Sequence, residues 1–202
     1  MKVIIIDNYD SFTYNLVQYI EELLGYEIDV YRNDEISLEE VGKYDVIFIS
    51  PGPGIPSESG ITMEVIKQYG PSKYIFGVCL GLQAITEVYG GSIYNLDTVF
   101  HGVSTQVKVV DEQDVIFKDL PEQFVAGRYH SWAAKAEDLP ESLKVTATDM
   151  DGSIMALSHI EYNVFGVQFH PESIMTEVGK DILRNFLVHA KLIREEIKGE
   201  VQ

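Results

Sequence analysis

The 202-residue sequence is poor in cysteine, in basic side chains and in long apolar runs. Its single cysteine excludes an internal disulfide framework and is compatible with a reducing compartment. No stretch of about 18 apolar residues is present to span a bilayer, and the apolar run at the N-terminus is too short for a signal peptide. We therefore expect a cytoplasmic protein that does not insert into a membrane.

Only 15 Lys and Arg stand against 32 Asp and Glu, which gives a formal net charge of −17. Such a surface repels phosphate backbones and anionic lipids, so we expect neither nucleic acid nor a membrane as a partner. The 46% hydrophobic content is ordinary for a globular protein. The length suits one domain, and no linker or repeat divides the chain, so we expect a single domain over residues 1–202.

Short apolar runs alternate with amphipathic segments in the first part of the chain, which predicts parallel strands connected by helices. Asp10 or Ser11 can cap the first helix and Gly25 can end it. Its apolar positions recur at helical spacing at Phe12, Leu16, Ile20 and Leu23. The predicted strands cover residues 3–6, 28–31, 46–49 and 74–78, and a further helix continues over 83–89.

The second half changes to short β-like runs separated by turns, at residues 105–110, 145–148, 154–157 and 164–169. A last helix is expected over 176–197, with one apolar face formed by Ile182, Phe186, Ile193 and Ile197. The fold class is therefore predicted as α/β. We expect an open, mostly parallel sheet with helices on both faces and an antiparallel or mixed extension.

Cys79 lies in Gly77-Val78-Cys79-Leu80-Gly81, between an apolar run and a helical pattern. This pattern is typical of a nucleophile elbow, in which flanking glycines allow a sharp turn that presents the central side chain. The N-terminus of the following helix favours negative charge on the sulfur. A small buried hydrophobic residue is the alternative for a lone cysteine.

His170 follows the apolar run 164–169, and Pro171 and Glu172 come directly after it. At a strand end the imidazole can act as a base, and the Glu172 carboxylate can orient it. The alternatives are a strand-end histidine bonded to a carbonyl, and a glutamate favoured by the dipole of the last helix.

An oxyanion site needs two backbone donors aimed at one point. The Leu80 N–H is one candidate, and the Gly52 N–H in the Pro- and Gly-rich segment 50–54 is the other. A tight turn with no further task is the alternative for this segment. A phosphate-binding loop is disfavoured because the Lys-Ser/Thr continuation is missing.

Three motifs in this order and spacing, Ser-Pro-Gly-Pro-Gly, Gly-Val-Cys-Leu-Gly-Leu-Gln and Gln-Phe-His-Pro-Glu-Ser, resemble the class I (triad-type) glutamine amidotransferases. The resemblance covers essentially the whole chain. It implies that Cys79 attacks the side-chain amide of glutamine, that His170 is base and then acid, and that Glu172 orients the imidazole. Neither a cofactor nor a metal is implied.

The resemblance also implies a glutamine-binding set in which Gln83 binds the amino-acid end and residues 128–132 form a second substrate loop. The predicted glutamine-binding residues are Gly52, Pro53, Gly54, Leu80, Gln83, Ser131 and Trp132, with Gly52 and Leu80 as the oxyanion hole. His130 is expected to pack near the pocket without a catalytic part. Leu82 and Trp132 depart from the family, which often has histidine and leucine there, and could alter local packing or the pocket wall.

The segment 7–15 and the residues after Glu172 resemble the chorismate-using branch, the small subunits of anthranilate synthase and aminodeoxychorismate synthase. The expected partner is a large chorismate-binding synthase subunit that consumes the ammonia, because we identify no acceptor domain in these 202 residues. Anthranilate synthase is the first choice, and aminodeoxychorismate synthase, or service to both, is the runner-up. A cysteine peptidase, the glutaminase subunit of GMP synthetase and a non-catalytic regulatory subunit remain alternatives.

Overall fold

Strands at the centre of the structure are apolar on both faces, as strands covered by helices on two sides must be. The computed structural model describes residues 1–194. Every residue of β1 (Val3–Asp7) is buried, and its alternate side chains enter two separate hydrophobic cores. Val3 and Ile5 lie in one core, and Ile4 and Ile6 lie in the other. The sheet therefore divides the interior into two layers.

Within residues 1–194, hydrogen bonding joins nine strands into one sheet, in the order β2-β1-β3-β4-β11-β10-β9-β6-β7. The pairs from β2 to β11 are parallel, whereas those from β11 to β7 are antiparallel. The other strands of this sheet are β2 (Asp29–Arg32), β3 (Val46–Ile49), β4 (Tyr74–Val78), β6 (Val103–Val109), β7 (Gln123–Arg128), β9 (Leu143–Asp149), β10 (Ile154–His159) and β11 (Val164–Val167). A second sheet pairs β5 (Ile93–Asn95) with β8 (Trp132–Ala134). The predicted fold class, including the antiparallel extension, is confirmed.

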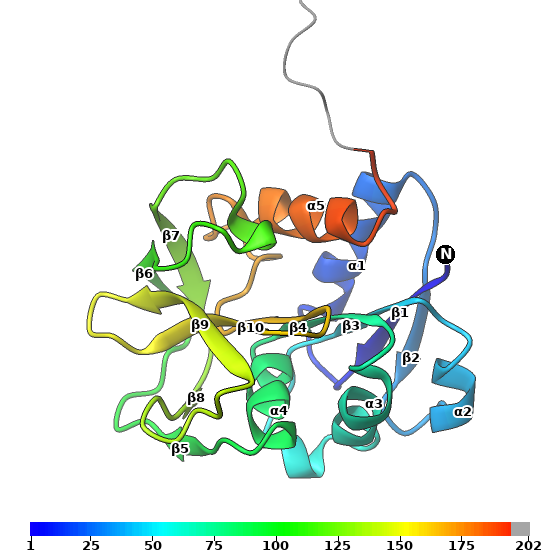
Figure 1. The fold of residues 1–202 in the computed structure, drawn as a ribbon, viewed down its shortest axis with the longest axis horizontal. Helices are drawn as coiled ribbons and strands as arrows, with labels where there is room; N and C mark the ends of the chain where they lie inside the picture. The colour runs from blue at the N-terminus through cyan, green and yellow to red at the C-terminus, as the bar shows by residue number, and fades with distance from the viewer. Residues whose placement is uncertain (195–202) are drawn as a thin grey trace, which may run out of the picture.

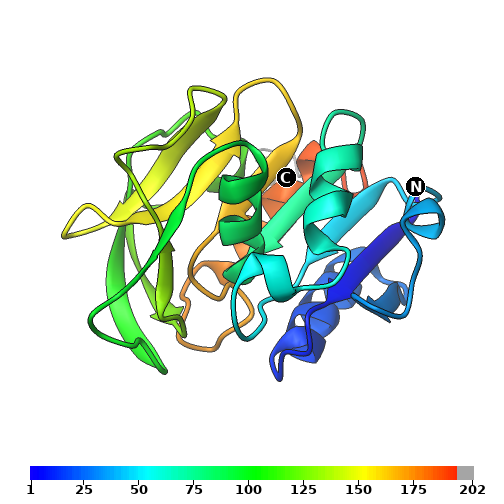
Figure 2. The ribbon, with the colours of Figure 1, turned by 90° about the horizontal axis from the view of Figure 1, so that it is seen from below.

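Helices cover both faces of the large sheet (Figure 1). Residues of α1 and α5 share one core with the sheet, and residues of α2, α3 and α4 share the other. The helices are α1 (Thr13–Leu24), α2 (Leu38–Val41), α3 (Thr62–Tyr69), α4 (Leu80–Val88) and α5 (Gly179–His189), with 3₁₀ turns η1 (Pro56–Glu58) and η2 (Val115–Phe117). Figure 2 shows the antiparallel strands as a lobe on the side away from β1 and β2.

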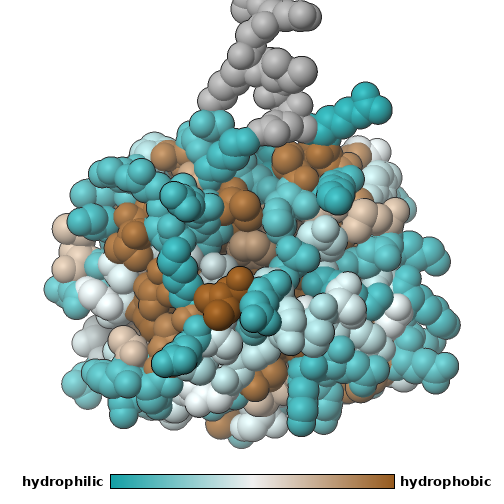
Figure 3. All heavy atoms as spheres, viewed as in Figure 1, coloured by the Kyte–Doolittle hydropathy of each residue, from teal (hydrophilic) through white to brown (hydrophobic). Residues whose placement is uncertain are grey.

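Hydrophilic side chains cover much of the face in Figure 3, in keeping with the acidic composition. Across residues 1–194, the structure contains no helix long and apolar enough to cross a membrane.

The predicted cap of the first helix was wrong in detail. Phe12 occupies the cap position of α1 and has no side-chain acceptor to cap the helix. The Asp10 carboxylate, two residues earlier, accepts a hydrogen bond from the Phe12 N–H at 2.7 Å. The Asp7 carboxylate accepts from the Tyr9 N–H and the Thr13 hydroxyl, so two acidic side chains organise this turn. Gly25, with φ 77°, ends α1 as predicted.

The last helix is shorter than the predicted 176–197. It begins at Gly179, and the Thr176 hydroxyl donates to the His170 carbonyl in the preceding loop. It ends at His189, and Lys191 has a left-handed φ of 61° that does not continue a helix. Ile182 and Phe186 lie in the core as expected, Ile193 packs against it beyond the helix, and Ile197 lies outside the described residues. The elements α3, β5, β7 and β8 were not predicted.

The turn from β4 into α4 depends on two glycines that lie in close contact with the backbone. A Cβ atom on Gly77 would be 2.6 Å from the carbonyl carbon of Gly81. A Cβ atom on Gly81 would be 3.0 Å from the carbonyl oxygen of Ile49 in β3. Helix α4 therefore lies so close to the sheet that a side chain at position 77 or 81 would clash with the backbone.

We expect Gly77→Ala to lower the free energy of unfolding by about 2–3 kcal/mol, because its methyl group would meet backbone that cannot move aside. Urea unfolding followed by circular dichroism measures the change. Gly25→Asn is the matched control, since its left-handed position is open and asparagine tolerates it, and should cost below about 1 kcal/mol. Equal costs for the two variants would contradict the steric explanation.

Candidate active site

Cys79 occupies the turn between β4 and α4 with φ 54° and ψ −101°, a conformation that side chains other than glycine rarely adopt. Its N–H donates to the Val167 carbonyl of β11 at 2.7 Å, which anchors the turn to the neighbouring strand. The side chain is almost fully buried, yet it lines a pocket. Helix α4 begins at the next residue, Leu80, and the first N–H groups of a helix have no acceptor within it.

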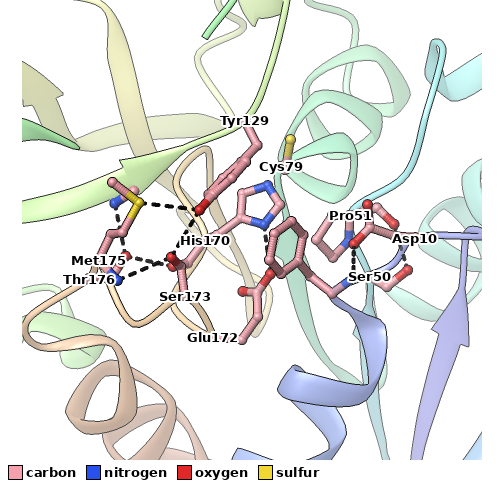
Figure 4. A network of polar contacts seen from close by, with 12 residues as sticks. Asp10, Ser50, Pro51, Cys79, Tyr129, His170, Glu172, Ser173, Met175 and Thr176 are labelled. Carbon is pink, nitrogen blue, oxygen red and sulfur yellow. Dashed lines mark hydrogen bonds and ion pairs between the residues drawn. The ribbon is translucent and has the colours of Figure 1, made fainter. Parts of the chain in front are cut away.

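His170 lies just beyond the end of β11, the strand that pairs with β4. Its ring lies between Cys79 and Glu172 (Figure 4). Its Nδ1 is 2.7 Å from Oε1 of Glu172, and both side chains are buried. Nε2 is buried and turned toward the Cys79 sulfur. The three residues therefore line up as thiol, imidazole and carboxylate.

Two aromatic rings cover the imidazole of His170. Phe12 meets it edge-on at 5.4 Å between centroids, and Tyr129 lies 4.8 Å away. Burial alone lowers the pKa of His170, but the Glu172 carboxylate and Cys79 outweigh it and hold that pKa well above its usual range. The ring is thus suited to carry a proton beside a negatively charged sulfur.

The pocket beside Cys79 has a volume of about 160 Å³. Six of the predicted glutamine-binding residues line it, namely Gly52, Pro53, Gly54, Gln83, Ser131 and Trp132, and Leu80 is buried next to it at the start of α4. Residues that the sequence prediction did not include also line it: Val99, Phe100, His101 and Tyr129. The role of the seven predicted residues in binding glutamine remains a prediction.

Asn8 holds the loop that carries Gly52. Its side-chain N–H donates to the Ser50 carbonyl at 3.0 Å, and its backbone N–H donates to the Ser50 hydroxyl at 2.8 Å. Its side-chain oxygen accepts from Asn33 and Thr62. A Cβ on Gly52 would lie 2.8 Å from the Asn8 carbonyl oxygen, so only glycine fits there.

His130 is a neutral, fixed imidazole on the far side of the pocket. Arg128 donates through Nε to its Nε2 at 3.0 Å, so Nδ1 carries the proton and donates to the Trp132 carbonyl at 2.8 Å. Burial and the Arg128 charge lower the pKa of His130 to about 4. Arg128 is itself buried and paired with Asp149 at 2.9 Å. The expectation that His130 packs near the pocket agrees with this placement.

Gln168 is the polar residue that the sequence reasoning missed. It is fully buried, directly after β11, and donates through Nε2 to the Cys79 sulfur at 3.5 Å. A signal was present, because Gln168 and His170 are two residues apart at a strand end and side chains at that spacing share a face.

The Leu82 and Trp132 departures occupy different surroundings. Leu82 is buried in the core beneath β11, where its Cα and Cβ would be 3.1 Å from a Cβ on Gly166, so it affects packing and does not reach the pocket. Trp132 lines the pocket.

Two other features carry no comparable chemistry. No group of three or more His, Cys, Asp or Glu in residues 1–194 could hold a metal ion. A larger surface hollow of about 690 Å³ lies between η2 and α5. We assign the site by its nucleophile and base and not by size, because that hollow contains no cysteine.

The fold and this site define a protein with the thiol, imidazole and carboxylate of a cysteine-dependent amide hydrolase at the carboxyl edge of a parallel sheet. The family model for glutamine amidotransferase class-I matches residues 4–190, so the chain belongs to that family.

Curated relatives support the same family. The chain is 48% identical over 187 residues to the aminodeoxychorismate/anthranilate synthase component 2 of Bacillus subtilis, covering 92% of this chain and 95% of that protein. It is 45% identical over 207 residues to the bifunctional protein TrpGD of Thermotoga maritima, covering 99% of this chain but only 35% of that protein.

A solved structure from Thermoplasma acidophilum, described as that of a putative GMP synthase subunit, superposes with a TM-score of 0.84 at 26% identity, covering 95% of this chain and 94% of that one.

The depressed pKa of His130 predicts a loss of stability in acid. Between pH 6.5 and about 4, the His130 side chain is protonated in the unfolded chain but stays neutral in the folded protein. Protonation therefore stabilises the unfolded chain, and the free energy of unfolding falls as the pH falls. The shift corresponds to roughly 3 kcal/mol when complete. His130→Gln should lose less stability between these pH values than the wild type, measured by urea unfolding across the range. The exposed His101→Gln variant is the control and should keep the wild-type slope.

Proposed function

We propose that residues 1–202 form one glutaminase domain that hydrolyses the side-chain amide of glutamine at Cys79. The observation that carries the proposal is the buried line of Cys79, His170 and Glu172 beside a pocket lined by Gly52 and Gln83. A thiol in hydrogen-bonding reach of an oriented base is the arrangement that acyl transfer requires. Membership of the class-I glutamine amidotransferase family supports glutamine as the substrate.

The thiolate sulfur of Cys79 attacks the amide carbonyl carbon, and the carbonyl oxygen becomes an oxyanion that accepts from the Gly52 and Leu80 N–H groups. His170 gives its proton to the amide nitrogen, and the carbon–nitrogen bond breaks. Ammonia departs, and the glutamyl group stays bound to Cys79 as a γ-glutamyl thioester. His170 then takes a proton from water, which attacks the thioester and releases glutamate and the thiolate. Glu172 holds the imidazole in one orientation and stabilises its charged form.

The two N–H groups of Gln83 are both engaged, by the Trp132 carbonyl at 2.8 Å and the Gln168 oxygen at 3.3 Å. Its own side-chain oxygen is left as an acceptor, which suits the α-ammonium group of glutamine. This supports the proposed role of Gln83 at the amino-acid end of the substrate. A peptide substrate lacks a free α-ammonium group beside its glutamine amide, which disfavours the peptidase alternative.

We further propose that the ammonia goes to a large chorismate-binding subunit that makes anthranilate, in the cytoplasm. The name of the Bacillus subtilis relative supports the chorismate branch and covers both anthranilate and aminodeoxychorismate, so the latter product stays the runner-up. The resemblance to a GMP synthase subunit rests on a lower identity of 26%. Ammonia must reach the second site unprotonated, because ammonium is not a nucleophile.

Cys79→Ala should lose glutamine hydrolysis by at least about 10³-fold, because no other group replaces the nucleophile. In the complex with the large subunit it should still support synthesis when ammonium salt replaces glutamine. Glutamate release measures the first result, and product formation from chorismate and ammonium measures the second. Retention of full glutaminase activity would show that the triad assignment is wrong. Labelling of wild-type Cys79 by a glutamine-like electrophile would exclude a purely regulatory subunit.

The chorismate branch is tested with the large subunit that co-purifies with this chain. Glutamine and chorismate should together give anthranilate, detected by its fluorescence. If aminodeoxychorismate forms in its place, the runner-up is correct, and a co-purifying GMP synthetase would reject both choices.

A further inference from the structure

A buried ion pair starts a chain of hydrogen bonds that ends on the nucleophile. Arg128 is 2% exposed, donates through Nη1 to Asp149, and stacks with its guanidinium carbon 3.7 Å above the Phe100 ring. Phe100 in turn stacks on His130 at 5.3 Å. Asp149 also accepts from the backbone N–H groups of Asp151 and Ser153, so the guanidinium has one fixed position.

The direction of every hydrogen bond in this chain follows from its fixed members. Arginine only donates, so Nε2 of His130 must accept and Nδ1 must donate to the Trp132 carbonyl. A carbonyl only accepts, so Gln83 must also present its nitrogen to Trp132.

The same logic fixes the two glutamine side chains. Because the nitrogen of Gln83 faces Gln168 at 3.3 Å, Gln168 must turn its oxygen toward Gln83. Its nitrogen then has one direction left, toward the sulfur of Cys79 at 3.5 Å. The opposite orientation would set two donors against each other and bring an oxygen against a thiolate.

We propose that Gln168 is a further catalytic residue, which donates a hydrogen bond to the thiolate of Cys79 and couples the sulfur to Gln83. This rests on the proposed thiol chemistry of Cys79. Gln168 is fully buried, and its amide nitrogen donates to the Cys79 sulfur. It stabilises negative charge on the sulfur without adding a second cation beside His170, and it ties the position of the nucleophile to the residue that meets the substrate.

Several titratable side chains lie around the sulfur. His170 faces it from the end of β11 with Glu172 behind, and Asp10 lies near His170 on the loop after β1. His101, Tyr129 and His130 line the same pocket as Cys79. Gln168 is uncharged, so its replacement by leucine changes none of these groups directly.

Gln168→Leu tests the proposal through the alkylation of Cys79 by iodoacetamide. At about pH 7 the rate should fall roughly tenfold, the effect of losing one hydrogen bond to a charged group, and at strongly alkaline pH, where every thiol is ionised, it should match the wild type. Glutaminase kcat should fall by a similar factor. The exposed Gln106→Leu variant is the matched control and should keep wild-type rates.

Gln168→Glu separates the two contacts. Its carboxylate still accepts from Gln83 but offers the sulfur no donor, so KM for glutamine should stay near the wild-type value while neutral-pH alkylation slows. If the leucine variant fails to fold by circular dichroism, the glutamate variant decides alone. Wild-type alkylation at neutral pH in a folded variant overturns the role of Gln168, whereas an active Cys79→Ala protein overturns the glutaminase proposal itself.

Discussion

The strained turn at Cys79 is the constraint on which the site depends. A side chain at φ 54° and ψ −101° persists only where its surroundings hold it, and here the contact of Gly77 with Gly81 and the hydrogen bond from Cys79 to Val167 do so. The turn lies on β4, between β3 and β11. The loop after β3 therefore brings Gly52 to the pocket beside the sulfur, and the segment after β11 brings the imidazole to Cys79. Because β3, β4 and β11 are neighbouring parallel strands, the segments that follow them lie at the same edge of the sheet.

Buried charge around the pocket is paired in each case, which lowers the cost of removing it from water. His170 is paired with Glu172, and Arg128 with Asp149. The two pairs act differently, because the first raises the pKa of a histidine and the second, through Arg128, lowers that of His130. One imidazole is therefore suited to move protons, while the other stays neutral and acts as a rigid connector.

The sequence predicted the parallel strands and the candidate triad because their signals are local. Runs such as Val46–Ile49 are apolar throughout, and His170 and Glu172 are only two residues apart. The strand order through β9 and β6 depends on pairings between distant segments, which periodicity does not encode. Lys191 ends α5 through a backbone conformation with no residue signature. Gln168 was missed because only His170 and Glu172 of its motif were given a chemical role, and its contact with the sulfur forms only once β11 lies beside β4.

A neutral hydrogen-bond donor at the sulfur can stabilise the thiolate with less loss of nucleophilicity than a cation would cause. A lysine at position 168 would hold the thiolate more tightly, but nucleophilicity falls as the thiolate is stabilised, so attack on an unreactive amide would slow. It would also lower the pKa of His170 by repulsion, whereas the mechanism that we propose needs that ring to protonate the leaving nitrogen. An amide gives about the strength of one hydrogen bond and leaves His170 as the cation beside the sulfur. In the role that we propose, the fully buried Gln168 stabilises negative charge on the Cys79 sulfur without a second cation beside His170.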